Sequence, residues 1–135
     1  MMLKITGIDH LNLEVIDLNE SCAFWKKLFG FETLEEIKEQ NGRIIGNRYA
    51  LLALYETPGM KKYEKVGFSH VSFHVENFDE VEQKCIELGI PIKYNGPISW
   101  PHSRSIYIED PNGYEIELAE HWGGKLVDTK DSNSC

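Results

Sequence analysis

Two segments of this chain repeat one pattern, sixty positions apart. Residues 8–15 read IDHLNLEV and residues 68–75 read FSHVSFHV, so each segment places a histidine at the same point of an alternating run. Each run leads into a similar helix start, DLNE at 17–20 and NFDE at 77–80. An internal repeat of this length predicts two small modules that must bury a core together.

Hydrophobic periodicity predicts the order β-α-β-β-β in each module, within a single domain of α+β class over residues 1–135. Helix starts at Asp17 and Asn77 and helix stops at Gly30 and Gly89 mark the two helices. The first module, 4–56, has predicted strands at 4–15, 31–38, 43–46 and 49–56; the second, 67–120, has them at 67–76, 91–95, 104–109 and 114–120. The polar tail 123–135 is expected to be partly disordered.

Charge and composition exclude several kinds of partner. The formal net charge of −8 argues against nucleic acid and anionic membranes. No apolar run approaches the roughly 18 residues of a membrane span. Three cysteines without a CxxC pair, and no signal segment at the start of the sequence, lead us to expect a reducing cytoplasm. The net charge says little about a small-molecule substrate, which we expect, because a pocket can be locally positive.

Alternation places polar side chains on matching faces of the two opening strands. These are His10, Asn12 and Glu14 in the first copy, and His70, Ser72 and His74 in the second. Polar residues would be costly if both faces filled a core, so we expect them to line a wet cavity.

Glu117 lies in the middle of the last predicted strand, where a solvated edge and a ligand role are the two options. Two imidazoles and one carboxylate form a minimal set for a divalent metal that keeps open positions for substrate. The alternative for each histidine is a hydrogen-bonded structural role.

Three motifs give the chain a specific resemblance. Asp9-His10-Leu11, Ser69-His70-Val71 and the segment 107–118, YIEDPNGYEIEL, resemble the vicinal oxygen chelate superfamily, which includes glyoxalase, bleomycin-resistance, fosfomycin-resistance and extradiol dioxygenase proteins. The resemblance implies paired βαβββ modules that form curled, mixed eight-stranded sheets around a metal cavity. It also implies His10, His70 and Glu117 as ligands of a divalent ion (Fe, Mn, Ni, Co or Zn) and, commonly, a homodimer.

The resemblance leaves the reaction open. Aligning the ends of the two modules puts Ala53 opposite Glu117, which counts against the four-ligand glyoxalase I pattern. The three-ligand pattern instead resembles extradiol dioxygenases and fosfomycin-resistance enzymes. His102 precedes Tyr107 as in the former, although at a shorter spacing. Fosfomycin-resistance members carry a threonine where this chain has Asn12.

From the sequence we slightly favour a dioxygenase-like activity over a lyase or isomerase, and both over a fosfomycin-resistance thiol transferase. Tyr107, His102 and His74, in that order, are the candidates for proton transfer or orientation. A non-catalytic, ligand-sequestering protein of the bleomycin-resistance type is the alternative from a different functional class.

Overall fold

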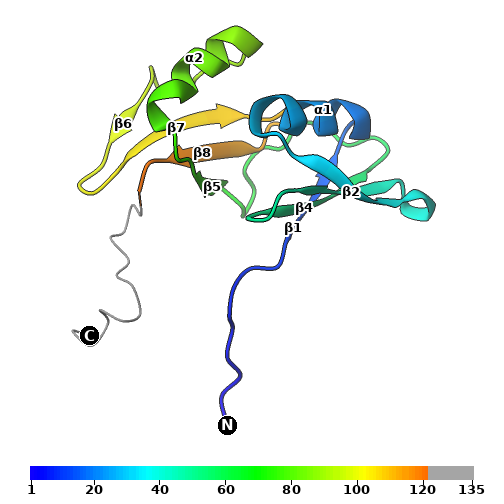
Figure 1. The fold of residues 1–135 in the computed structure, drawn as a ribbon. Coiled ribbons are helices and arrows are strands. Elements are labelled where there is room, and N and C mark those ends of the chain that lie inside the picture. Colours follow the sequence, from blue (N-terminus) through cyan, green and yellow to red (C-terminus); the bar gives the residue numbers. More distant parts are fainter. Residues whose placement is uncertain (122–135) are drawn as a thin grey trace. The chain divides into compact units, whose positions relative to one another are not determined.

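A computed structural model describes residues 1–121; the predicted tail, 123–135, lies outside the described residues. The chain divides into two compact units, Met1–Tyr63 (unit 1) and Glu64–Cys135 (unit 2), which we describe separately (Figure 1). Within residues 1–121, no helix has the length and apolar character that a membrane crossing requires.

Unit 1 is a four-stranded mixed sheet with one long helix. Its strand order is β1-β4-β3-β2, in which only β1 and β4 run parallel. The elements are β1 (Leu11–Val15), α1 (Leu18–Phe29), β2 (Glu32–Ile37), the 3-10 helix η1 (Lys38–Gln40), β3 (Gly42–Gly46) and β4 (Leu51–Glu56).

The ends of α1 form as the sequence predicts. Asp17 accepts a hydrogen bond from the Glu20 backbone N–H through its side chain, which satisfies one of the unpaired donors at the helix start. Gly30 ends the helix in the left-handed region at φ 70°, where a residue without Cβ is favoured. Trp25 is buried and its ring stacks on Phe31 at 5.6 Å.

Unit 2 repeats this topology. Its strand order is β5-β8-β7-β6, and again only the first and last strands run parallel. The elements are β5 (His70–His74), α2 (Phe78–Leu88), β6 (Ile98–Ser99), β7 (Arg104–Glu109) and β8 (Glu115–Ala119). The predicted order βαβββ is therefore confirmed in both halves.

The two faces of the unit 2 sheet differ in chemistry. Apolar side chains from β7 and β8 are fully buried on one face: Ile106, Ile108, Ile116 and Leu118. Alternation places Ser105, Tyr107 and Glu109 of β7, and Glu115 and Glu117 of β8, on the opposite face. We call this second face the polar face of unit 2.

A tight turn joins β7 to β8 and sets their register. The buried Asp110 carboxylate accepts from the backbone N–H groups of Asn112 and Tyr114, both at 2.9 Å. Gly113 occupies the left-handed region at φ 89°. This turn places Tyr107 directly opposite Glu117 in the ladder.

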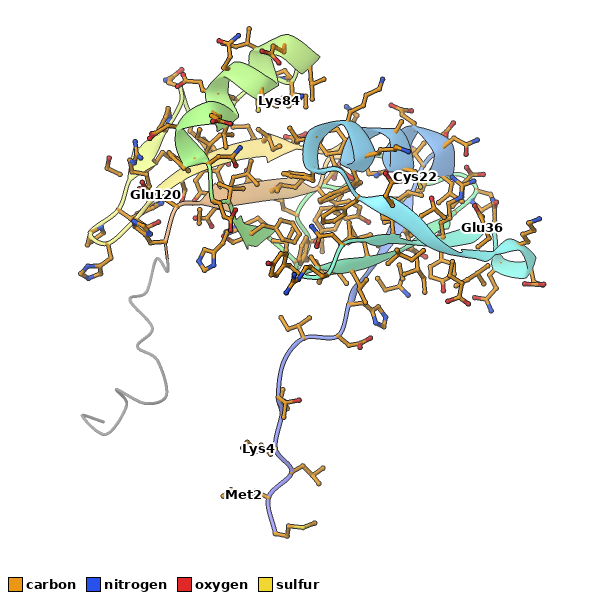
Figure 2. All side chains as sticks on the ribbon, viewed as in Figure 1. Met2, Lys4, Cys22, Glu36, Lys84 and Glu120 are labelled. Carbon is orange, nitrogen blue, oxygen red and sulfur yellow. The ribbon has the colours of Figure 1, made fainter. Side chains whose placement is uncertain are left out.

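Two strand predictions are wrong. Residues 4–10 lie in no strand of the structure: β1 begins at Leu11, and the segment that carries Met2 and Lys4 is extended and exposed (Figure 2). Residues 91–95 lie in no strand: Tyr94 and Asn95 form a turn, with φ of 58° and 64°, outside the range of a strand. The short strand β6 begins later, at Ile98.

Candidate functional site

His70 and Glu117 form the centre of the polar face. They are 47 residues apart in sequence, but parallel pairing of β5 with β8 makes them neighbours. The His70 Nε2 atom lies 3.0 Å from Glu117 Oε1. Two of the three predicted metal ligands therefore meet within unit 2.

Hydroxyl groups hold both side chains in place. Ser105 donates to Glu117 Oε2 at 2.5 Å, and the Ser69 hydroxyl lies 3.0 Å from His70 Nδ1. A neutral His70 that donates Nε2–H to Glu117 accepts the Ser69 hydroxyl at Nδ1. Metal binding at Nε2 would move the ring proton to Nδ1, where Ser69 accepts it instead.

Tyr107 covers this pair. Its ring meets the His70 ring edge to face at 5.8 Å. Burial, together with the negative charge of Glu117, raises the pKa of the Tyr107 hydroxyl to about 12. The sequence prediction that Tyr107 lies beside the site is consistent with this geometry.

The His70–Glu117 pair fits a divalent metal. First-row metal ions bind imidazole nitrogen and carboxylate oxygen at about 2.1 Å, so two ligand atoms at adjacent vertices lie about 3.0 Å apart. The separation of Nε2 and Oε1 matches that distance. No group of three metal-binding side chains is gathered among residues 1–121. Within unit 2 the pair therefore offers two candidate ligand atoms.

His10, the third predicted ligand, belongs to unit 1 and immediately precedes β1 rather than lying within it. Its Nδ1 is 2.7 Å from Asp9 Oδ2. An ionised carboxylate only accepts, so a neutral His10 donates Nδ1–H and keeps its lone pair on Nε2. Like His70, His10 thus has the side chain that precedes it at its Nδ1.

The two histidines predicted to be catalytic, His74 and His102, are both exposed. His74 ends β5 and is exposed, opposite Ala119 in the ladder. His102 is exposed in the turn between β6 and β7, which is closed by a hydrogen bond from the Trp100 N–H to the Ser103 carbonyl at 2.7 Å. Among residues 1–121, His102 has no described contact with His70 or Glu117 that would give it a part in proton transfer.

Sequence reasoning missed a second carboxylate on the polar face. Glu115 is buried and lies directly opposite His70 in the ladder. Its Oε1 is 2.8 Å from Lys93 Nζ and 3.1 Å from Lys65 Nζ, and it also accepts from the Tyr94 hydroxyl. Burial raises the pKa of Glu115, but these donors outweigh it and hold the pKa at about 2. Strand alternation with Glu117 was the available signal for Glu115; Lys65 and Lys93 lie in loops that carry no periodic pattern.

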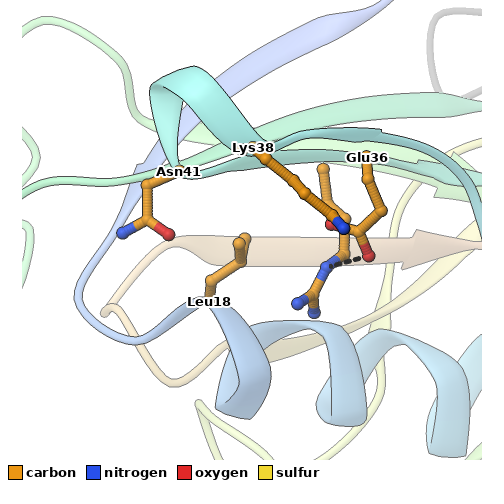
Figure 3. A pocket seen from close by; sticks show the side chains of 6 residues that line it. Leu18, Glu36, Lys38 and Asn41 are labelled. Atoms are coloured by element: carbon orange, nitrogen blue, oxygen red, sulfur yellow. Dashed lines mark ion pairs between the residues drawn. The ribbon is translucent and has the colours of Figure 1, made fainter.

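A separate hollow of about 450 Å³ lies in unit 1 (Figure 3). Within it, Arg43 Nε is 2.8 Å from Glu36 Oε1, at an angle poor for a hydrogen bond. Arg43 is opposite the fully buried Leu54 in the ladder, so it shares the apolar face of the sheet and not the face that carries Ala53. None of the predicted site residues is in the lining, which consists of Leu18, Glu36, Lys38, Asn41, Gly42 and Arg43.

Comparisons with known proteins agree with this architecture. The family model described as "Glyoxalase/Bleomycin resistance protein/Dioxygenase superfamily" matches residues 7–118. Metallothiol transferase FosB of Bacillus licheniformis is 30% identical over 118 residues, covering 85% of this chain and 75% of the relative. Lactoylglutathione lyase of Escherichia coli O157:H7 is 28% identical over 121 residues, covering 82% and 90%.

A solved structure adds a metal and a ligand to the comparison. It is a variant of the fosfomycin resistance protein FosX of Listeria monocytogenes, complexed with Mn(II) and 1S,2S-dihydroxypropylphosphonic acid. It matches with a TM-score of 0.70 and 25% identity, covering 85% of this chain and 90% of that one. Together with the repeated βαβββ units, these matches show that the chain belongs to the glyoxalase/bleomycin resistance protein/dioxygenase superfamily.

Proposed function

We propose that this protein is a divalent-metal-dependent enzyme that opens a small epoxide phosphonate of the fosfomycin type by adding a thiol or water. His10, His70 and Glu117 would hold the metal. The observation that carries the proposal is the His70–Glu117 pair, with its ligand atoms 3.0 Å apart and hydroxyls of Ser105 and Tyr107 around it. The relatives named metallothiol transferase and fosfomycin resistance protein support the same substrate class.

The reaction balances without a redox partner. A thiol sulfur or water oxygen attacks one epoxide carbon, the C–O bond of the ring breaks, and the nucleophile's proton ends on the released oxygen. The bound cation would supply Lewis-acid stabilisation of the charge that develops on that oxygen. Ser105 keeps Glu117 in one orientation, and the Tyr107 hydroxyl beside Glu117 is placed to donate a hydrogen bond to a substrate oxygen.

The structure changes our order of preference among reactions. A dioxygenase-like activity relied on His102 as the acid or base, and His102 is exposed in a turn with no described contact to the His70–Glu117 pair. A glyoxalase I activity needs a fourth ligand at the position of Ala53. The ladder partners of Ala53 and Glu117 are equivalent, Asn12 and Ser72 in the parallel strands, so Ala53 does occupy that position in unit 1.

We also propose that the protein is a homodimer in a reducing cytoplasm, where a thiol co-substrate is plentiful. Mixing tests how the ligands combine. His10→Ala and His70→Ala are each expected to lose metal binding alone. If the site forms across two chains, co-refolding the two variants restores one intact site per mixed dimer; if it forms within one chain, co-refolding restores none.

Metal analysis followed by a substrate panel tests the proposed reaction. Purified protein is assayed for bound Mn, Fe, Co, Ni and Zn, and then incubated with Mn(II), fosfomycin and either water, glutathione or cysteine, with 31P NMR as the readout. Loss of the epoxide signal that depends on metal and disappears in Glu117→Gln supports the proposal. Exposed Glu76→Gln is the matched control and should keep the activity.

Other outcomes would replace the proposal. Cleavage of a catechol would return the dioxygenase interpretation, and isomerisation of a hemithioacetal would indicate a lyase. Metal-free protein that binds fosfomycin or a drug without converting it would support the sequestering alternative.

A further inference from the structure

We infer that Glu115 is a positioning residue for His70: it stabilises the form of the imidazole that presents Nε2 to the metal. This inference rests on the proposed function, because it takes His70 as a metal ligand. It concerns a carboxylate that none of the comparisons assigns a role.

The first step is the way Glu115 is anchored. All three of its donors converge on one oxygen, Oε1: the ammonium groups of Lys93 and Lys65, and the Tyr94 hydroxyl. The other oxygen, Oε2, is turned toward His70 and lies 3.8 Å from Nδ1. The carboxylate is therefore fixed through one oxygen while the other faces the ring nitrogen opposite Nε2.

The second step is electrostatic. At 3.8 Å Oε2 is too far for a direct hydrogen bond to Nδ1. The Glu115 side chain is 4% exposed and the His70 side chain 34% exposed, so water screens the pair only in part. In the metal-free protein Glu117, 3.0 Å from Nε2, favours the ring proton on Nε2. The negative charge of Glu115 near Nδ1 lowers the cost of moving that proton to Nδ1 when Nε2 binds a metal. A carboxylate that accepts a hydrogen bond from the far nitrogen of a ligand histidine increases its strength as a ligand. Here the Ser69 hydroxyl is the hydrogen-bond partner of Nδ1, at 3.0 Å, and Glu115 acts on the same nitrogen through its charge.

The third step is mechanical. Tyr94, tied to Glu115 by its hydroxyl, meets Tyr107 edge to face at 5.4 Å, and Tyr107 meets His70 in the same manner at 5.8 Å. Three rings thus stand in series, with Glu115 holding the outermost one. Rotation of Tyr94 would loosen the packing that fixes the His70 ring.

The backbone shows a cost for bringing these donors together. Lys65 and Tyr94 both adopt the left-handed region, with φ of 59° and 58°. Neither is glycine, asparagine or aspartate, the residues that tolerate this region best, so each conformation carries backbone strain. Three loop residues contact Glu115, and the strain falls on two of them, Lys65 and Tyr94; the third is Lys93. Strain that recurs around one carboxylate indicates that the placement of that carboxylate matters.

The test compares Glu115→Gln with Glu109→Gln. Glu109 is the matched control, because it pairs with the same Lys93 at 2.9 Å and its removal deletes the same charge, but it is more exposed and has no described contact with His70 or Tyr94. Full-length protein is titrated with Co(II) and Mn(II) by calorimetry, and the Co(II) absorption spectrum is recorded. Thermal unfolding confirms that each variant is folded.

We expect Glu115→Gln to weaken metal binding on the order of 10-fold and to change the Co(II) spectrum. Glu109→Gln should stay within about 2-fold of the parent protein, with an unchanged spectrum, because a second-sphere effect is confined to groups near the ligand. Tyr94→Phe, which deletes one donor and keeps the ring, should have an intermediate effect. Glu115→Asp should restore part of the affinity.

Two results would overturn the inference. One is a folded Glu115→Gln variant with unchanged affinity and spectrum; the other is an equal loss in Glu109→Gln, which would indicate a general charge effect. If Glu115→Gln does not fold, an unchanged Co(II) spectrum in folded Tyr94→Phe overturns the mechanical step and with it the inference as stated.

A separate measurement distinguishes failure of the inference from failure of the proposed function. If the parent protein binds no divalent metal, the proposed function fails. The 15N resonances of His70 in metal-free protein then still report on Glu115: they should move in Glu115→Gln and not in Glu109→Gln. No movement there contradicts the inference independently of any metal.

Discussion

In unit 1, one face of the sheet carries Leu51, Ala53 and Ile44; at the equivalent ladder positions unit 2 carries Glu115, Glu117 and Tyr107. The strand order and the pairing directions are the same in both units. The backbone framework therefore does not determine which face becomes a site. Three apolar-to-polar differences on one face separate unit 1 from the unit that holds the His70–Glu117 pair and the groups around it.

The helices show a second difference between the units. Trp25 in α1 and Cys85 in α2 occupy equivalent places after the two N-caps, and both are buried. Unit 1 fills that space with an indole that packs on Phe29 and Phe31, whereas unit 2 uses a single thiol. The buried side chain at this position is large in unit 1 and small in unit 2. Truncating each to alanine should therefore lower the free energy of unfolding by unequal amounts.

The largest predicted effect is a loss of stability on truncation of the buried helix residue, and it tests whether the two cores differ. Trp25→Ala should lower the free energy of unfolding by about 3–5 kcal/mol, since it leaves a large cavity within an aromatic cluster. Cys85→Ala should cost only about 1 kcal/mol, because it removes one sulfur atom. Urea unfolding followed by circular dichroism measures both. Equal losses would mean that the two helices do not pack in equivalent ways.

The second prediction concerns a substitution that makes the polar face of unit 2 more like the equivalent face of unit 1. Glu117→Ala places in unit 2 the residue that unit 1 has at Ala53, and should weaken Mn(II) or Co(II) binding by at least about 100-fold, more than loss of a supporting group does. Calorimetric titration measures the affinity. Glu82→Ala, on the exposed side of α2, serves as the control. Unchanged metal stoichiometry in Glu117→Ala would remove Glu117 from the ligand set.

A smaller effect on stability is expected at the N-terminal caps of the two helices, which also differ. The Asp17 side chain caps α1, whereas Asn77 makes no side-chain cap bond and instead donates to the Glu80 carboxylate at 2.9 Å. Asp17→Ala should therefore cost about 1 kcal/mol of stability, and Asn77→Ala clearly less. Thermal unfolding of the two variants side by side is sufficient. A larger loss for Asn77→Ala would reverse our assignment of the stronger cap.

Much of the architecture was predictable because it depends on local periodicity. Strand 104–109 and helix 78–88 have the bounds that alternation and the glycine stop indicate. The face shared by Tyr107 and Glu117 follows from the same alternation. The strand predicted at 91–95 is wrong because Tyr94 and Asn95 adopt the left-handed region. Asn95-Gly96 was an available turn signal, whereas the contact of Tyr94 with Glu115 is tertiary and has no local pattern.

The sequence predicted that His70 and Glu117 lie close together, but not the groups that support them. His70 opens β5 and Glu117 lies in β8 of the same module, so parallel pairing of the first and last strands could be expected to make them neighbours. Lys93 and Lys65 reach Glu115 from loops, and their sequence spacing to it, over 20 residues in each case, carries no periodic signal. Supporting groups of this kind depend on loop geometry, which a single sequence encodes weakly.

Parallel pairing of the first and last strands has a consequence for unit 2 as a whole. His70 opens β5 and Glu117 lies within β8, so a cation bound by both would link the first and last strands of unit 2. A link between residues far apart in sequence restricts the unfolded chain more than a local one does. Loading with metal should then protect the amide hydrogens of β5 and β8 from exchange, far beyond the immediate surroundings of the two ligands.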